Sequence, residues 1–294
     1  MKLKLPAVSA LLFLFLQGCA TTKESDVNLA NLIITEPLPI NQQSEIALAR
    51  LSEILTRVEV TPEQRAKLFY DRGVIYDSVG LRGLASFDFQ RAIRLQPNLV
   101  DAYNFIGIHH TQRQDFLQAY EAFDSAIELD PMHEYAYLNR GIALYYGARP
   151  SLAIADLSHF KEAQQHDPYR IAWVYLIEND IDPITAKAHL RTNLDAIDHN
   201  SWANNVLRLF LDEISEQEFI AQLGVGVTSH KELTNRLCEA YFYLGKYHLL
   251  KQQPSVAAKY FKLALSTNVY EFIEHRYAKL ELQLLNSTVG PQIN

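Results

Sequence analysis

A 34-residue period is the feature of this sequence that most constrains its fold. Glycine recurs with this period at Gly73, Gly107 and Gly141. Two further series keep the same step, an alanine series and an aromatic series: Ala85, Ala119, Ala153 and Phe69, Tyr103, Tyr137. A fixed period of this length indicates a repeat protein, in which each repeat is one supersecondary unit that stacks on its neighbours.

The repeated residue types have a physical role. Small residues stand where two antiparallel helices must approach closely, and large apolar ones such as Phe89 and Phe123 fill the space opposite them. Pro97 and Pro131 follow the second helix of a unit, because proline cannot continue it. The pattern resembles the tetratricopeptide repeat family. The resemblance implies an all-α solenoid of helix-turn-helix units with a concave face.

The repeats divide the chain into segments. Residues 66–99, 100–133 and 134–170 match the repeat pattern, and a fourth unit keeps the same offsets around Gly245. From Gly141 to Gly245 is 104 residues, three periods plus two, so degenerate units are expected between them. Extra helices are expected over 43–58 and, as a cap, over 270–285. The predicted organisation is: 1–18 lipoprotein signal peptide, 19–42 flexible tether, 43–65 N-terminal helix and link, 66–170 three repeats, 171–237 degenerate helical repeats, 238–271 a further repeat, 272–294 capping helix and tail.

The N-terminus has the form of a targeting signal. A basic start precedes an apolar run from Leu5 to Leu16, which is too short to span a bilayer. Gly18-Cys19 closes this run and resembles the bacterial lipobox, which implies cleavage before Cys19 and lipidation of its thiol. By resemblance to enteric-type sorting, Ala20 in place of Asp implies an outer-membrane anchor with the body in the periplasm. The alternative is a plain signal peptide with an accidental cysteine.

Composition and motifs argue against several function classes. The chain has 294 residues with a net charge of −7 and contains no cluster of Lys and Arg, so nucleic acid is not expected as a partner. No GxSxG, HExxH, CxxC or P-loop motif occurs. We therefore expect no enzyme activity, no metal and no cofactor. Cys238 is expected to be a buried, inert thiol, and His275 to be a surface or interface residue.

The tetratricopeptide resemblance also implies which residues line the concave face. Tyr70 and Val74 occupy the two positions where a carboxylate clamp has Lys and Asn, so such a clamp for an acidic C-terminal tail is not expected there. An aromatic and apolar groove suits an extended or helical peptide instead. The alternative for the last two of the following residues is that they only pack between helices. The predicted groove comprises Tyr70, Asn104, Ile108, Tyr135, Leu138, Tyr145 and Tyr146.

Four segments carry a more specific resemblance. Residues 119–131, 138–147, 243–247 and 274–282 are similar to the NlpI-type family of outer-membrane lipoproteins. This resemblance implies a homodimeric adaptor that binds a tail-specific periplasmic protease and presents a murein endopeptidase and other cell-wall enzymes to it. Regulation of peptidoglycan remodelling and cell division would follow. The resemblance is weakest over 171–237.

The extra N-terminal helix is the predicted dimer contact. Its apolar stripe lies outside the repeats and needs a cover. The alternative is that this helix only caps the first repeat. The predicted contact residues are Leu51, Ile54, Leu55 and Val58.

Two other functions remain as alternatives to the adaptor. A structural assembly lipoprotein, such as a pilotin or an outer-membrane assembly component, predicts a monomer that follows a secretin or barrel partner. An unrecognised cell-wall hydrolase predicts that the isolated protein releases muropeptides.

Overall fold

The computed structural model describes residues 32–56, 59–198 and 201–288. Within these residues the chain forms fourteen helices and no strand, so the expected all-α class is confirmed. The helices are α1 (Gln42–Thr56), α2 (Pro62–Ser78), α3 (Arg82–Leu95), α4 (Val100–Gln112), α5 (Phe116–Leu129), α6 (Glu134–Tyr146), α7 (Pro150–Ala163), α8 (Pro168–Ile181), α9 (Pro183–Ala196), α10 (Asn204–Phe210), α11 (Glu216–Ala221), α12 (His230–Leu250), α13 (Pro254–Leu265) and α14 (Ile273–Thr288).

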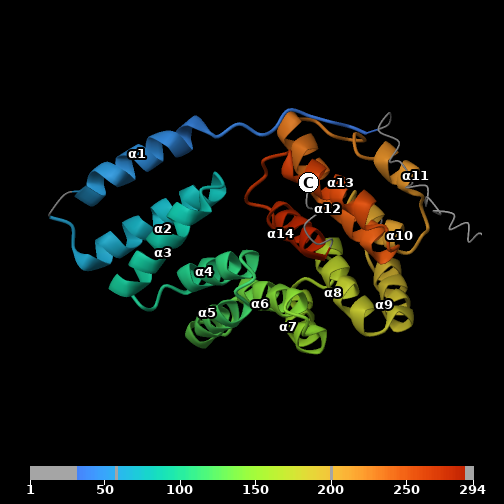
Figure 1. The fold of residues 1–294 in the computed structure, drawn as a ribbon, viewed down its shortest axis with the longest axis horizontal. Coiled ribbons are helices and arrows are strands. Elements are labelled where there is room, and N and C mark those ends of the chain that lie inside the picture. Colours follow the sequence, from blue (N-terminus) through green and yellow to red (C-terminus); the bar gives the residue numbers. More distant parts are fainter. Residues whose placement is uncertain (1–31, 57–58, 199–200, 289–294) are drawn as a thin grey trace, which may run out of the picture.

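Antiparallel helix pairs stack into a curved array, as the tetratricopeptide pattern predicts (Figure 1). The pairs are α2 with α3, α4 with α5, α6 with α7, α8 with α9, and α12 with α13. In four of these pairs three residues join the two helices, and the middle one adopts a left-handed conformation at Gly80, Gln114, Ala148 and Gln252, with φ of 80°, 64°, 57° and 59°. The first three of these positions are again 34 residues apart.

The periodic glycines allow the two helices of a pair to touch. A Cβ atom added at Gly107 would lie 2.5 Å from the ring of Phe123, and one at Gly245 would lie 2.4 Å from the ring of Phe261. Real Cβ atoms do not approach other heavy atoms so closely, because interiors are packed to crystal-like density. The packing role inferred for the small residues is therefore confirmed.

The degenerate region holds one complete pair and one shortened pair. Pro168 is the first residue of α8, where its missing N–H costs nothing, and Asp167 caps that helix by accepting from the backbone N–H groups of Tyr169 and Arg170. Asp182 caps α9 in the same manner. Helices α10 and α11 then span only 7 and 6 residues. Two degenerate units were expected here, and the second has collapsed to two short helices.

Helix α14 does more than cover the end of the solenoid. It packs on α13, and it also contacts α12 and α4 on the inner side of the curve (Figure 1). The ring of Tyr277 stacks 5.3 Å from Tyr146 on α6 and meets Trp173 on α8 edge-on at 6.0 Å. The last helix therefore lies across the concave side of the array.

The N-terminal segment is held against the C-terminal half of the molecule. Leu38 N donates to Thr267 O at 3.0 Å, the His230 ring lies 3.1 Å from Glu36 O, and the Tyr241 hydroxyl donates to Ile33 O. The tether predicted over 19–42 is therefore wrong for residues 32–41, which are extended but docked. The signal peptide and Cys19 lie outside the described residues.

Helix α1 follows the docked segment and lies alongside α2 (Figure 1). It was expected over 43–58 and is found at Gln42–Thr56, with Val58 outside the described residues. In the part of the chain that the structure describes, no helix has the length and apolarity needed to cross a bilayer.

Candidate functional site

The predicted groove residues divide into buried and exposed ones. Asn104, Ile108 and Leu138 are buried, and Asn139 Nδ2 donates to Asn104 Oδ1 at 3.0 Å across the repeat boundary. Tyr135 is 58% exposed, and Tyr70 is partly buried. The structure therefore brings the first three into the packing between helices, and it leaves Tyr135 the most accessible of the set.

Tyr145 and Tyr146 pack between helices. The Tyr146 hydroxyl donates to Glu281 Oε1 at 2.8 Å, and Lys246 Nζ donates to the Tyr145 hydroxyl at 2.9 Å. Lys246 also pairs with Glu281 at 2.5 Å. Burial alone would lower the pKa of Lys246, but the Glu281 carboxylate raises it above its ordinary value. Both tyrosines thus belong to the contact between α6, α12 and α14.

A second polar cluster fixes α14 to the first repeats. Asp77 on α2 accepts from Arg276 Nη2 at 2.6 Å, and its other oxygen lies 2.7 Å from His109 Nε2 on α4. Ser86 Oγ lies 2.6 Å from His109 Nδ1, so the ring can donate to Asp77 while it accepts from the serine. Burial raises the pKa of Asp77, but the bond from His109 and the charge of Arg276 lower it to a net value below the ordinary one.

The predicted groove included no residue of α14. The prediction took the concave face to be free, whereas α14 covers much of it. His275 was expected at a surface or an interface; its side chain is buried rather than exposed, and Nε2 lies 3.2 Å from Leu265 O at the end of α13. Burial and the nearby charge of Arg82 lower the pKa of His275 to about 4. Alternating charged and aromatic residues from Glu274 to Tyr277 were the available signal for a helix buried on several sides.

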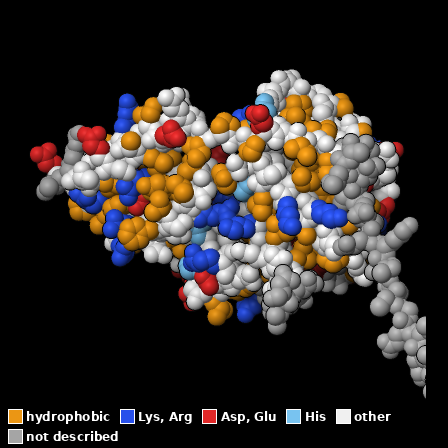
Figure 2. All heavy atoms as spheres, turned by 45° about the horizontal axis from the view of Figure 1, so that its top comes forward, with side chains coloured by type: hydrophobic (Ala, Val, Ile, Leu, Met, Phe, Trp, Pro, Cys, Tyr) orange, Lys and Arg blue, Asp and Glu red, His pale blue; other side chains and the backbone are white. Residues whose placement is uncertain are grey.

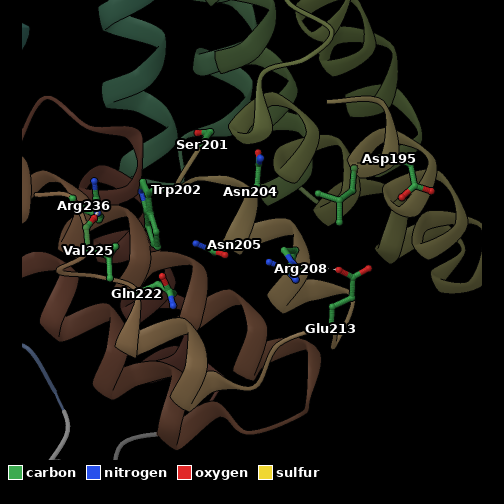
Figure 3. A pocket seen from close by; sticks show the side chains of 12 residues that line it. Asp195, Ser201, Trp202, Asn204, Asn205, Arg208, Glu213, Gln222, Val225 and Arg236 are labelled. Atoms are coloured by element: carbon green, nitrogen blue, oxygen red, sulfur yellow. Dashed lines mark hydrogen bonds and ion pairs between the residues drawn. The ribbon is translucent and has the colours of Figure 1, made fainter. Parts of the chain in front are cut away.

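A polar cavity of about 710 Å³ lies in the degenerate region, between the end of α9 and helices α10, α11 and α12. Figure 3 shows Asn205 between Trp202 and Arg208 at its wall. The guanidinium of Arg236 lies 5.3 Å from the Trp202 ring and donates to Val225 O at 2.6 Å. Arg236 is therefore held by groups of the protein itself, and the rest of the wall presents amide, hydroxyl and charged groups to a small polar ligand.

The described residues contain no group of three or more His, Cys, Asp and Glu side chains that could hold a metal ion. Cys238 is buried, as expected, and burial raises the pKa of its thiol well above the ordinary value.

The N-terminal helices expose apolar surface. No residue of α1 is buried, and its stripe residues Leu51, Ile54 and Leu55 are only partly covered. Polar contacts join α1 to α2, including a hydrogen bond of 3.1 Å from Arg72 Nη1 to Ser52 Oγ. On α3, large apolar side chains are left in solvent, with Leu84 at 50% and Phe87 at 49% exposure. These two sets are apolar surfaces that could receive a protein partner.

Comparisons with known proteins found structural likenesses at low sequence identity. No family model matches the chain. A tetratricopeptide repeat protein from Parabacteroides merdae ATCC 43184 is 14% identical, with a TM-score of 0.48 over 82% of this chain and 90% of that one. MamA from Desulfovibrio magneticus RS-1 is 17% identical, with a TM-score of 0.42 over 69% and 94%. YrrB, described as a TPR protein with an unusual peptide-binding site, is 13% identical, with a TM-score of 0.40 over 82% and 99%.

Proposed function

We propose that this chain is an outer-membrane-anchored periplasmic adaptor. In this role it binds a tail-specific protease and presents a murein endopeptidase and other cell-wall enzymes to it, and so regulates peptidoglycan remodelling and cell division. The observation that carries the proposal is the exposed apolar surface of α1 and α3 on a rigid repeat array. All bond-breaking chemistry would belong to the partners, while the adaptor raises their effective concentration.

A second copy of the chain is the proposed cover for α1. Its apolar stripe, with Leu51, Ile54 and Leu55, lies beside α2 without any residue reaching full burial. In a two-fold symmetric dimer, the α1 stripes of the two copies would be buried against each other at one interface. Replacing Leu51 and Ile54 by Glu should give a monomer in light scattering. Ile184→Glu, at an 84% exposed position on α9, should leave the dimer intact.

The proposed anchor is lipidated Cys19. It would leave the body near the C-terminal half, because residues 33–38 are held by Tyr241, Thr267 and their neighbours. The anchor would join the body at its C-terminal half, whereas the apolar surface of α3 lies in the N-terminal half.

The test uses the mature chain with Cys19→Ser, mixed with the tail-specific protease and the endopeptidase of the same cell. We expect the endopeptidase to disappear faster only when the chain is present and the protease is active. Leu84→Glu with Phe87→Glu should slow this loss, whereas Ile184→Glu should not. Absence of both binding and acceleration would overturn the proposal. A monomer that co-purifies with a secretin or barrel protein would favour a structural assembly lipoprotein instead.

A further inference from the structure

A cavity of about 780 Å³ lies where the start of α3, the end of α4 and helix α14 meet. It is separate from the pocket beside Trp202 and from the apolar surface of α1 and α3. Its wall holds four cationic side chains and one carboxylate, Asp115; the cations are Arg82, Arg113, Arg276 and Lys279. Figure 2 shows basic side chains gathered in the middle of the molecule. This local excess runs against the chain's net charge of −7.

Two of these cations have partners and two do not. Arg113 Nε pairs with Asp115 at 3.0 Å, and Arg276 pairs with buried Asp77 at 2.6 Å. Within the described ranges, the side chains of Arg82 and Lys279 form no hydrogen bond and no ion pair, although the charge of Asp77 acts on Arg82. The four cations of the wall therefore face two carboxylates, Asp115 and Asp77, which leaves an excess of positive charge.

Burial and the positive charge of the wall together lower the pKa values of two neighbouring groups. Burial lowers the pKa of Arg82; Asp77 opposes this, and the charge of Arg276 lowers it further. His275, next in sequence to Arg276, also has a lowered pKa, through burial and then the charge of Arg82. An anion in the cavity would relieve this repulsion, since an opposite charge favours the charged form of a cation.

A third wall residue points to the kind of anion. The carboxamide of Gln112 is buried, and neither Nε2 nor Oε1 has a hydrogen-bond partner among the described residues. A buried amide without partners costs free energy, because it has lost its hydrogen bonds to water. A carboxamide offers one acceptor and one donor side by side, which matches the N–H and C=O of a peptide group.

We propose that this cavity binds an acidic segment of a partner protein, with an Asp or Glu carboxylate of that segment on Arg82 and Lys279 and one of its peptide groups on Gln112. The proposal rests on the proposed adaptor function and names the chemistry of one partner. It differs from a clamp at the first-helix positions of Tyr70 and Val74, because Arg82 lies on the second helix of its repeat and Lys279 on α14.

The test measures binding of a fluorescein-labelled hexaglutamate peptide to the mature chain with Cys19→Ser, by fluorescence anisotropy. We expect binding that weakens as salt rises, and no binding of a hexaglutamine peptide. Arg82→Gln should weaken binding on the order of tenfold, the usual effect of one charge-assisted hydrogen bond. Lys279→Gln should weaken it less, and Gln112→Leu should weaken it without changing the salt dependence. The control is Arg94→Gln, an exposed arginine on the same helix as Arg82, which should bind as the parent does.

Circular dichroism establishes that each variant is folded, and Lys279 is exposed, so its variant tests the site even if Arg82→Gln unfolds. The proposal is overturned if Lys279→Gln and Gln112→Leu both bind the peptide as tightly as the parent does. It is also overturned by an equal loss in Arg94→Gln, which would show unspecific attraction, or by complete displacement by the same concentration of inorganic phosphate, which would show a small-anion site. The assay needs neither protease nor endopeptidase, so its failure is distinct from failure of the adaptor proposal.

Discussion

Arg276 and Asp77 are 199 residues apart in the chain, yet Nη2 of the arginine lies 2.6 Å from Oδ2 of the aspartate. Both side chains are buried, and His109 completes the cluster from α4. Through this pair the last helix of the protein is fixed to its first repeat. The concave side of the array is therefore an internal contact over much of its length.

Asp77→Asn should be strongly destabilising. The variant keeps the shape of the side chain but leaves Arg276 buried without a counter-charge, and breaking a buried pair in this way costs about 3–5 kcal/mol. Urea denaturation measures the loss, and hydrogen exchange should show faster exchange of the α14 amides. The matched control is Asp71→Asn on the same helix. Asp71 pairs at the surface with Lys67, so its loss should cost below about 1 kcal/mol. Similar losses in the two variants would contradict this reading.

Gly107→Ala should destabilise the protein by about 1–3 kcal/mol, because the new Cβ would force the buried ring of Phe123 or the helix itself to move. Gly83→Ala is the matched control. It lies in α3 with open space around its Cα, so alanine should be neutral there or stabilise by up to about 1 kcal/mol. Chemical denaturation of the two variants under one set of conditions tests the pair. A loss of stability in both would refute a specific helix contact at Gly107.

Glu274 should make the protein less stable as pH rises. Burial raises the pKa of this carboxyl to about 8, and Glu239 adds to the rise. The folded state then keeps a proton that the unfolded state releases near pH 4.5, so the free energy of unfolding falls as pH rises between these values. The expected fall from about pH 6 to about pH 8 is about 2 kcal/mol.

The variant Glu274→Gln should lose most of this slope. Gln cannot titrate, and it can still accept the hydrogen bond that the Tyr243 hydroxyl donates at 3.1 Å. Urea denaturation at several pH values measures the slope. Glu162→Gln, at an exposed position, should keep the parent's slope. Equal slopes in the parent and in Glu274→Gln would show that Glu274 is ionised in the folded state over this range.

Cys238 should resist thiol reagents in the folded protein. With Cys19→Ser it is the remaining thiol of the chain, and it is buried with a raised pKa. Reaction with Ellman's reagent should be at least about 100-fold slower in buffer than in urea, because the thiolate is scarce and the sulfur is covered. A cysteine placed at exposed Ser151 in a Cys238→Ser background should react quickly in both. Fast reaction of Cys238 in buffer would show that α12 opens readily.

The sequence period accounts for the helix pairs from α2 to α7 and for α12 with α13. It works because each contact, such as Gly107 with Phe123, lies inside one unit and repeats in the next. The extra helix at 43–58 was also found with its start one residue early, at Gln42–Thr56. The short lengths of α10 and α11 could not be derived from the period, since their sequences no longer carry the repeated residues.

The contacts of α14 with the predicted groove and the docking of residues 32–41 escaped the sequence for another reason. Tyr146 meets Glu281 across 135 residues, and no local pattern reports such a contact. The prediction therefore treated first-helix positions as free surface, although α14 lies against several of them. The segment predicted as a tether is polar in overall composition, but its apolar residues Leu32 and Ile33 pack on the core of the C-terminal half.

The two long-range attachments, α14 on the first repeats and residues 33–38 on the last ones, change how the array must come apart. A stack in which each repeat touches only its neighbours can open from one end while the rest stays folded. Here, opening the first repeat also releases the final helix, and releasing the N-terminal segment uncovers α12. The protein should therefore unfold in one cooperative step, and a pulling force applied by a partner at one end is resisted by the whole array.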